Sequence, residues 1–346
     1  MIYFDCEKMR YPNTGLYYYS YYLGKALLST KYADRMGFFT PKSVGNIFGD
    51  DRHYLHRGIR TKYLLLDRDI ELWHSSYQLS RYLPMRGKII QTVHDLNFLY
   101  EGVTPQKQRR YMKRIHRHLH KINRIVAISE FVRQDILNHI DVGNIPVDVV
   151  YNGCNSFTGQ IQQPKEMPER PFLFSVATVL PKKNFHVLPC LLATCDYDLL
   201  IAGNTSDYCT TIIDEARKWG VADRVKFVGP VTEGEKHWYL SHCEAFLFPS
   251  IAEGFGLPPI EAMQYGKPVF LSDHTCLPEI GGDSAFYFNH DFDREQMQRE
   301  FDNGMNAYLA NQPSFEARLK ANAARFDWNT TARQYAELYD KVLGEN

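Results

Sequence analysis

Long apolar runs are missing from this sequence. A membrane-spanning helix needs about 20 predominantly apolar residues, and no stretch of the chain approaches that length. The first residues, Met1–Asp5, read as a strand and lack the basic and apolar segments of a signal peptide. We therefore expect a cytoplasmic protein.

Paired cysteines and an excess of one charge are missing as well. The seven cysteines are odd in number and scattered, with no Cys-x-x-Cys pair and no Cys/His ligand spacing, so we expect reduced thiols that fill the core. The 40 Lys and Arg residues balance 40 Asp and Glu residues, whereas a general nucleic-acid-binding protein would show a basic excess. We therefore expect no nucleic-acid partner.

Low-complexity segments and short internal repeats are also absent, which leaves an ordinary globular chain. Its 346 residues suffice for about two domains, and 44% hydrophobic with 23% charged residues is typical of soluble proteins. Strands and helices alternate through both halves, which predicts an α/β fold with parallel, doubly wound sheets. The expected strands are 2–5, 71–74, 88–93, 124–128, 172–179, 198–202, 225–228, 244–249 and 269–272. The expected helices are 14–30, 107–124, 184–193, 207–219, 235–242 and 258–266, and the last helices, after residue 292, end with 328–343.

The most informative segment is a glycine-rich turn between an expected strand and an expected helix. It places Glu253 and Glu261 on either side of Gly254, Gly256 and two prolines. In such a unit the turn lies at the carboxyl end of a parallel sheet, where the helix amino terminus offers unpaired N–H groups to a phosphate. The two carboxylates would lie beside that anion site and accept hydrogen bonds from hydroxyls, which suits a nucleotide sugar.

This segment resembles the nucleotide-sugar motif of glycosyltransferase family 4, the group 1 glycosyltransferases, in which two glutamates separated by seven residues enclose an EGFGLP-type turn. Further segments resemble the family in its own order: Asn13–Gly15, Thr92–Leu96, Ile125–Glu130, Val149–Gly153, Phe172–Asn184, Asp223–Gly229 and Leu277–Gly281. The resemblance covers nearly the whole chain. It implies the GT-B fold, in which two Rossmann-like domains face each other across a cleft.

The resemblance also implies a domain plan. Residues 1–155 would form the acceptor-binding domain, 156–170 a linker, and 171–325 the nucleotide-sugar-binding domain. Residues 326–346 would form a terminal helix that crosses back to the first domain.

By the same resemblance, the site residues take separate roles. Lys182 and Lys183 would supply positive charge to the donor diphosphate without a metal, Glu261 would accept hydrogen bonds from the ribose, and Glu253 would face the transferred sugar. The expected catalytic residues are Glu253, Lys183 and His94, and the expected donor-binding residues are Gly15, Lys182, Lys183, Gly254, Phe255, Gly256, Leu257 and Glu261. For His94, which follows a strand, contact with the sugar or acceptor and a structural hydrogen bond both remain open.

The chain departs from the family at Thr178, where many members have an arginine that reaches the phosphate. Neutralisation should therefore depend more on Lys183. No Asp-x-Asp pair stands suitably before the donor site, and we expect neither a metal nor another cofactor.

A basic segment is the chain's most uneven distribution of charge. Residues 107–124 carry eight Lys or Arg, three His and no acid, with apolar residues at helical spacing. A solvated helix face is one explanation. The other is attraction to anionic lipid or to an acceptor pyrophosphate through Arg110, Lys113, Arg114 and Arg117, with the protein peripheral on the inner face of the cytoplasmic membrane.

The expected function is a retaining glycosyltransferase for a glycan or lipid-linked acceptor in cell-surface polysaccharide or lipopolysaccharide synthesis, with GDP-mannose as the first choice of donor. Retention comes from the resemblance alone. Two alternatives remain open: a nucleotide-sugar epimerase or hydrolase on the same fold, and a protein that binds nucleotide sugar without catalysis.

Overall fold

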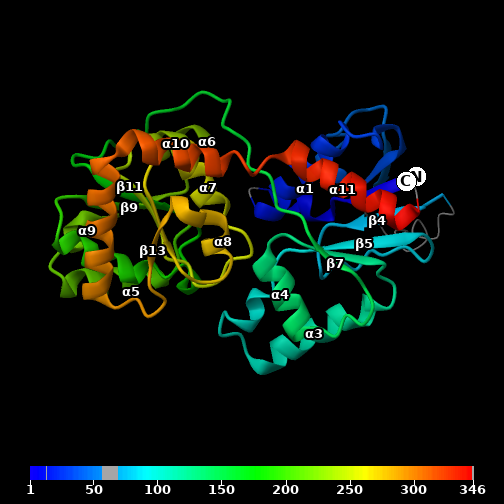
Figure 1. The fold of residues 1–346 in the computed structure, drawn as a ribbon, viewed down its shortest axis with the longest axis horizontal. Helices are drawn as coiled ribbons and strands as arrows, with labels where there is room; N and C mark the ends of the chain where they lie inside the picture. The colour runs from blue at the N-terminus through cyan, green and yellow to red at the C-terminus, as the bar shows by residue number, and fades with distance from the viewer. Residues whose placement is uncertain (13, 57–68, 345–346) are drawn as a thin grey trace. The chain divides into compact units, whose positions relative to one another are not determined.

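A computed structural model describes residues 1–12, 14–56 and 69–344 (Figure 1). The chain divides into two compact units. The first contains Met1–Gly153 together with Phe326–Asn346, and the second contains Cys154–Arg325.

The first unit is built on a seven-stranded sheet in the order β3-β2-β1-β4-β5-β6-β7, in which every neighbouring pair is parallel. Its strands are β1 (Ile2–Asp5), β2 (Met36–Thr40), β3 (His53–His56), β4 (Leu72–Ser75), β5 (Lys88–Val93), β6 (Arg124–Ala127) and β7 (Val147–Val149). Its α-helices are α1 (Gly15–Leu27), α3 (Pro105–Leu119), α4 (Glu130–His139) and α11 (Trp328–Leu343). The central strands β1, β2 and β4 are buried along their whole length, as expected for parallel strands covered on both faces.

The second unit repeats this plan with a six-stranded parallel sheet in the order β10-β9-β8-β11-β12-β13. Its strands are β8 (Phe172–Val176), β9 (Asp198–Ala202), β10 (Val225–Gly229), β11 (Ala245–Phe248), β12 (Val269–Ser272) and β13 (Phe286–Phe288). Its α-helices are α5 (Tyr208–Lys218), α6 (Glu233–His242), α7 (Leu257–Gln264), α8 (Leu277–Gly281), α9 (Arg294–Ala310) and α10 (Gln312–Ala323). The expected α/β class with two doubly wound parallel sheets is confirmed.

Short 3-10 helices complete both units, at Glu7–Arg10, Ala33–Arg35, Lys42–Val44, Asn97–Leu99, Pro181–Lys183, Phe185–Ala193, Ala222–Arg224 and Gly282–Ser284. The helix expected over 184–193 is present as the 3-10 helix Phe185–Ala193, with Pro189 inside it. The basic helix was expected to reach residue 124 but ends at Leu119, since Asn123 accepts a hydrogen bond from the Ile89 N–H at 2.8 Å and Arg124 opens β6.

The strand order reverses once in each sheet, between β1 and β4 and between β8 and β11. At such a reversal the loops after the two neighbouring strands diverge, and the space between them is where open α/β sheets bind ligands. In the second unit these loops are the turn after β8 that contains Lys182 and Lys183, called the lysine turn, and the loop after β11 that contains Glu253, called the glutamate loop.

The terminal helix α11 packs against α1 in the first unit (Figure 1). Its hydroxyl groups enter a buried hydrogen-bond network. Tyr339 OH lies 2.8 Å from His74 Nδ1, His74 Nε2 lies 2.9 Å from Thr92 Oγ1, and Thr92 Oγ1 lies 2.9 Å from Tyr335 OH. Tyr335 OH is also 2.9 Å from Tyr19 OH on α1. Burial lowers the pKa of His74 to about 3, so the imidazole in this network is neutral.

Helix α1 contains five tyrosines, at positions 17, 18, 19, 21 and 22. Of these five tyrosines, only Tyr19 is buried in α1. Tyr17 stacks on Tyr21 and Tyr18 stacks on Tyr22, and these four rings are partly exposed. Ring stacking thus covers part of the aromatic surface that the core does not take up.

Among the helices of the described residues, none has both the length and the apolar character that a membrane span requires.

We expect Tyr339→Phe to lower the free energy of unfolding by ~1–3 kcal/mol, because the substitution leaves the buried His74 Nδ1 without its partner. Urea unfolding at neutral pH measures this. Tyr21→Phe is the control, since its partly exposed ring keeps its stacking contacts. Equal midpoints for the two variants would show that the hydroxyl contributes nothing.

Candidate active site

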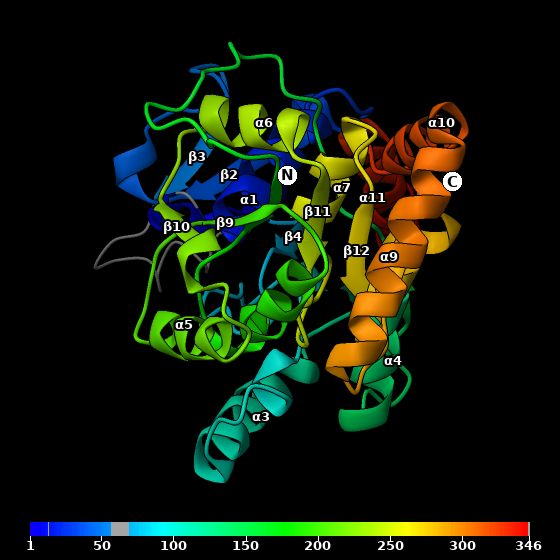
Figure 2. The ribbon, with the colours of Figure 1, turned by 90° about the vertical axis from the view of Figure 1, so that its left-hand side faces the viewer.

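The glutamate loop leads from β11 into α7, which lie side by side in the second unit (Figure 2). Gly256 is the N-cap of α7 and has φ +101°, a conformation that side-chain-bearing residues rarely adopt. A Cβ at this position would lie 3.0 Å from Leu277 Cδ2. Pro258 follows within the first turn, and Gly266 beyond the helix has φ +71°. Prolines at the start of a helix and a left-handed glycine after its end are both common helix boundaries.

The lysine turn is fastened to the glutamate loop by hydrogen bonds. The Lys182 carbonyl accepts from the Ile251 N–H at 2.9 Å and from Ser250 Oγ at 3.1 Å. Asn184, which is buried, closes the turn with φ +59°. These hydrogen bonds therefore join two loops that are about 70 residues apart in sequence, at the carboxyl edge of the sheet.

Lys183 and Glu253 form an ion pair between these loops, and each side chain is 14% exposed. The Lys183 ammonium also lies 5.0 Å from the centre of the Phe248 ring. The pair places one cation and one carboxylate at the β8/β11 reversal, next to the start of α7. Phosphate and sugar hydroxyl groups are the ligands that such a pair can bind.

Glu261, in the middle of α7, is paired with Lys236 of α6 at 2.9 Å. The side chains are 18% and 13% exposed. Burial raises the pKa of Glu261, and Lys236 acts against that rise. Burial acts to lower the pKa of Lys236, but the carboxylates of Glu261 and Glu233 outweigh it and raise that pKa.

Glu233, His237 and Glu261 offer ligand atoms that lie within 4.8 Å of one another. A divalent cation could be held by such a set. However, the Lys236 ammonium lies 2.9 Å from both carboxylates, so a cation of the chain itself already lies between them and offsets part of their charge.

The remaining expected donor residues of the second unit lie in the same loop. Gly254 and Phe255 are buried, and the Phe255 carbonyl accepts a hydrogen bond from Cys276 Sγ at 3.1 Å. The Phe255 ring, 5% exposed, is therefore part of the core beneath the loop. Leu257 begins α7, and Thr178, where many relatives have an arginine, is exposed beyond β8.

The expected residues of the first unit lie at the carboxyl edge of its own sheet. Gly15 is exposed at the start of α1, and a Cβ there would meet nothing within 4 Å; its neighbour Asn13 lies outside the described residues. His94 follows β5 and donates from Nε2 to the Ser76 carbonyl at 2.8 Å, while its ring packs edge-on against Tyr19. Burial lowers the pKa of His94 to about 4, so its ring is neutral near pH 7. The structural hydrogen bond considered for this residue is thus present, and a sugar contact stays a prediction.

The four basic residues proposed for an acceptor or membrane differ in accessibility. Arg110, Lys113 and Arg117 are exposed on α3, whereas Arg114 is half-buried and donates to the Leu79 carbonyl at 2.7 Å. Figures 1 and 2 both show α3 at the periphery of its unit. Arg124, the last cation of the basic segment, is paired with Asp148 and belongs to the sheet.

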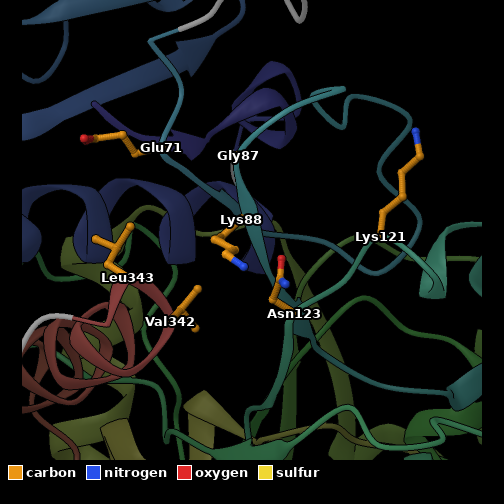
Figure 3. A pocket seen from close by; sticks show the side chains of 7 residues that line it. All are labelled: Glu71, Gly87, Lys88, Lys121, Asn123, Val342 and Leu343. Atoms are coloured by element: carbon orange, nitrogen blue, oxygen red, sulfur yellow. The ribbon is translucent and has the colours of Figure 1, made fainter.

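A separate cavity of about 590 Å³ lies in the first unit (Figure 3). It is lined by Glu71, Gly87, Lys88, Lys121, Asn123, Val342 and Leu343. Glu71 precedes β4 and Lys88 begins β5, so the cavity lies at the amino edge of the sheet, opposite to the loops that follow the strands. Glu71 already pairs with the terminal ammonium group and Arg35. We assign no function to this cavity.

Sequence reasoning missed Lys236 and the role of the Lys182 carbonyl. Lys236 stands in a predicted helix among charged residues and looks like an ordinary surface cation. Only the packing of α6 against α7 brings it to Glu261, and no local pattern carries that information.

The family models for "Glycosyltransferase Family 4" and "Glycosyl transferases group 1" match residues 29–156 and 157–326. The O-antigen chain mannosyltransferase RfbU of Salmonella typhimurium is 27% identical over 251 residues, which cover 71% of this chain and 68% of that protein. The serotype-specific mannosyltransferase WbdA of Escherichia coli is 29% identical over 246 residues, covering 63% of this chain but only 29% of WbdA.

Among solved structures, the sucrose-phosphate synthase of Thermosynechococcus elongatus superposes with a TM-score of 0.72 at 19% identity, covering 100% of this chain and 99% of that one. Anabaena Alr3699/HepE in complex with UDP and glucose gives a TM-score of 0.70 at 17% identity and covers 98% and 99%. These likenesses establish the fold. Because the two family models together span residues 29–326, the chain belongs to the group 1 glycosyltransferases, family 4.

Proposed function

We propose that the protein is a metal-independent, retaining mannosyltransferase. It would move mannose from GDP-mannose to a glycan or lipid-linked acceptor in the synthesis of a cell-surface polysaccharide such as an O-antigen. The observation that carries the proposal is the Lys183–Glu253 ion pair at the β8/β11 reversal. Glu261 lies in α7, the helix that follows the loop containing Glu253. The named mannosyltransferase relatives support the choice of sugar.

The chemistry requires positive charge at the leaving group. When the bond from the anomeric carbon to the diphosphate breaks, negative charge grows on phosphate and positive charge grows on the sugar. Lys183 and the N–H groups of Gly256 and Leu257 at the start of α7 would stabilise the first. Glu253, already beside Lys183, would face the sugar and accept from its hydroxyls, and Glu261 would bind the ribose.

Activation thus involves an exchange of partners at Lys183. The ammonium that contacts Glu253 would turn to, or be shared with, the donor diphosphate, which has more negative charge than one carboxylate. Glu253 would then be released toward the sugar. Gly15 stays a predicted donor-binding residue by the resemblance; it is exposed, and a Cβ there would meet nothing within 4 Å.

The proposal is tested with a panel of radiolabelled nucleotide sugars and an acceptor extract of polyprenyl-linked glycans, in the presence of excess EDTA. We expect transfer of mannose from GDP-mannose that EDTA does not abolish. Isomerised donor or free sugar would favour the epimerase or hydrolase, and binding without turnover would favour the non-catalytic alternative. A complete loss that magnesium reverses would rule out metal independence.

Lys183→Ala should lower kcat/KM by about 100- to 1000-fold, because it removes a preorganised charge at the leaving group. Lys183→Arg should retain more activity than the alanine variant. Lys218→Ala is the control, since Lys218 is 71% exposed and pairs with Glu215 on α5. Unchanged kinetics in a folded Lys183→Ala protein would remove Lys183 from the site.

We propose further that the exposed cations of α3 contact anionic lipid at the inner face of the cytoplasmic membrane. The triple change of Arg110, Lys113 and Arg117 to Gln should abolish most binding to phosphatidylglycerol vesicles. Binding by the parent should weaken with salt, because surface attraction is screened over about 8 Å at physiological ionic strength. Arg114 is left unchanged because it holds the Leu79 carbonyl.

The matched control changes Arg217, Lys218 and Arg299 to Gln, which removes the same charge from side chains that are 66%, 71% and 65% exposed. This control should bind vesicles as the parent does, and neither variant should change nucleotide affinity. If both triple variants lose vesicle binding equally, only net charge matters. If neither loses it, α3 is a solvated face.

A further inference from the structure

Lys236 occupies a position between two carboxylates on neighbouring helices. Its Nζ lies 2.9 Å from Glu261 Oε1 of α7 and 2.9 Å from Glu233 Oε2 of its own helix α6. Lys236 is 13% exposed and Glu261 18%, whereas Glu233 is 55% exposed. The interaction with Glu261 is therefore the desolvated one, and in a desolvated pair removal of one charge leaves the other uncompensated.

The start of α6 is rigidly fixed, which fixes Lys236. Thr232 and Glu235 form a capping box: the Glu235 N–H donates to Thr232 Oγ1 at 3.2 Å, and the Thr232 N–H donates to Glu235 Oε2 at 2.8 Å. Lys236 is the next residue. Its stem thus leaves the helix from a well-ordered turn and reaches a single target on α7.

The other groups around Glu261 do not carry positive charge near pH 7. Burial lowers the pKa of His237 to about 4, so its ring is neutral. Burial, followed by the charge of Glu261, raises the pKa of the Cys154 thiol and of the Tyr265 phenol, so both stay protonated. Glu233 adds negative charge. Among the groups placed around Glu261, Lys236 is the one that favours its ionised form.

We propose that Lys236 is a positioning residue that keeps the Glu261 carboxylate ionised and oriented to accept hydrogen bonds from the ribose of the donor. The inference rests on the proposed function, because it assumes that Glu261 binds a nucleotide. It adds a second lysine with a task separate from that of Lys183. Lys183 meets the diphosphate, and Lys236 acts through Glu261.

The proposal makes a distinctive prediction for pH. Without Lys236, nothing offsets the effect of burial, and the pKa of Glu261 rises further. Protonation then removes the charged acceptor as the pH falls. Lys236→Met should therefore weaken nucleotide affinity by about tenfold or more at pH 8, the size of one lost charged hydrogen bond, and by a larger factor at pH 6.

The experiment is calorimetric titration between pH 6 and pH 8.5, with whichever of GDP, UDP, ADP and dTDP the parent binds most tightly. We expect the parent and Lys236→Arg to show nearly constant affinity. Lys236→Met and Lys236→Gln should lose affinity increasingly as the pH falls. In the double variant Lys236→Met, Glu261→Gln the extra pH dependence should disappear, because the titrating group is gone.

Lys226→Met is the matched control. Lys226 pairs with the buried Asp198 at 2.7 Å in the same unit, but both residues lie at the amino edge of the sheet, away from the site. It should bind nucleotide as the parent does at every pH. Circular dichroism and urea unfolding establish that each variant is folded, and the glutamine variant replaces the methionine variant should the latter unfold.

Two outcomes would overturn the proposal. Parent-like binding by Lys236→Met, with weakened binding by Glu261→Ala, would leave Glu261 in its role and remove Lys236. A loss that is the same at every pH would mean that Lys236 contacts the ligand directly or supports the fold. A parent that binds none of the four nucleotides would contradict the proposed function instead, which separates the two failures.

Discussion

Parallel strands deliver all their following loops to one edge of the sheet, and the site of the second unit depends on this constraint. Because the strand order reverses between β8 and β11, the lysine turn and the glutamate loop emerge side by side and diverge. The two hydrogen bonds to the Lys182 carbonyl then join them. The two loops are distant in sequence, so these hydrogen bonds hold them close enough for Lys183 to pair with Glu253.

Charge compensation is the second organising feature of the site. Each glutamate of the motif is paired with a lysine that comes from another element: Glu253 with Lys183 after β8, and Glu261 with Lys236 on α6. A partly buried carboxylate is unfavourable without a partner, so each lysine compensates the charge of its glutamate at the edge of the core. A diphosphate would add negative charge to this arrangement, and Lys183, by the proposed function, would transfer its interaction to it.

Much of the fold could be predicted from local patterns. Strand and helix alternation gave two parallel sheets, and the strands Ile2–Asp5, Lys88–Val93 and Asp198–Ala202 have the predicted bounds. Short strands at sheet edges, such as β3 and β13, escaped because a few residues carry no clear period. The helix expected over 184–193 is present, but the sequence pattern did not specify that it would be a 3-10 helix.

The site was predictable in proportion to how local its parts are. The glycine turn and its two glutamates are contiguous, so a single motif placed them. The partners of those glutamates are 70 and 25 residues away, and their selection is decided by tertiary packing. Tertiary packing also involves the segment 156–170, which was expected to be a linker. The Phe157 ring stacks on the His237 ring with 4.2 Å between their centroids, and Gln162 accepts a hydrogen bond from Thr232 at 3.3 Å. Part of this segment therefore packs on α6.

In the first unit, polar groups inside the core determine how the last helix is seated. Tyr335 and Tyr339 are four residues apart and therefore share one face of α11. An apolar face alone could settle against α1 in several registers, because hydrophobic contact has no direction. The hydroxyls remove that freedom, since a shift by one turn would leave His74 Nδ1 without its partner Tyr339 and would take the Tyr335 contact away from Thr92. Specific hydrogen bonds thus tie the terminal helix to the first unit. In the sequence, the more than 170 residues of the second unit lie between this helix and the other residues of the first unit.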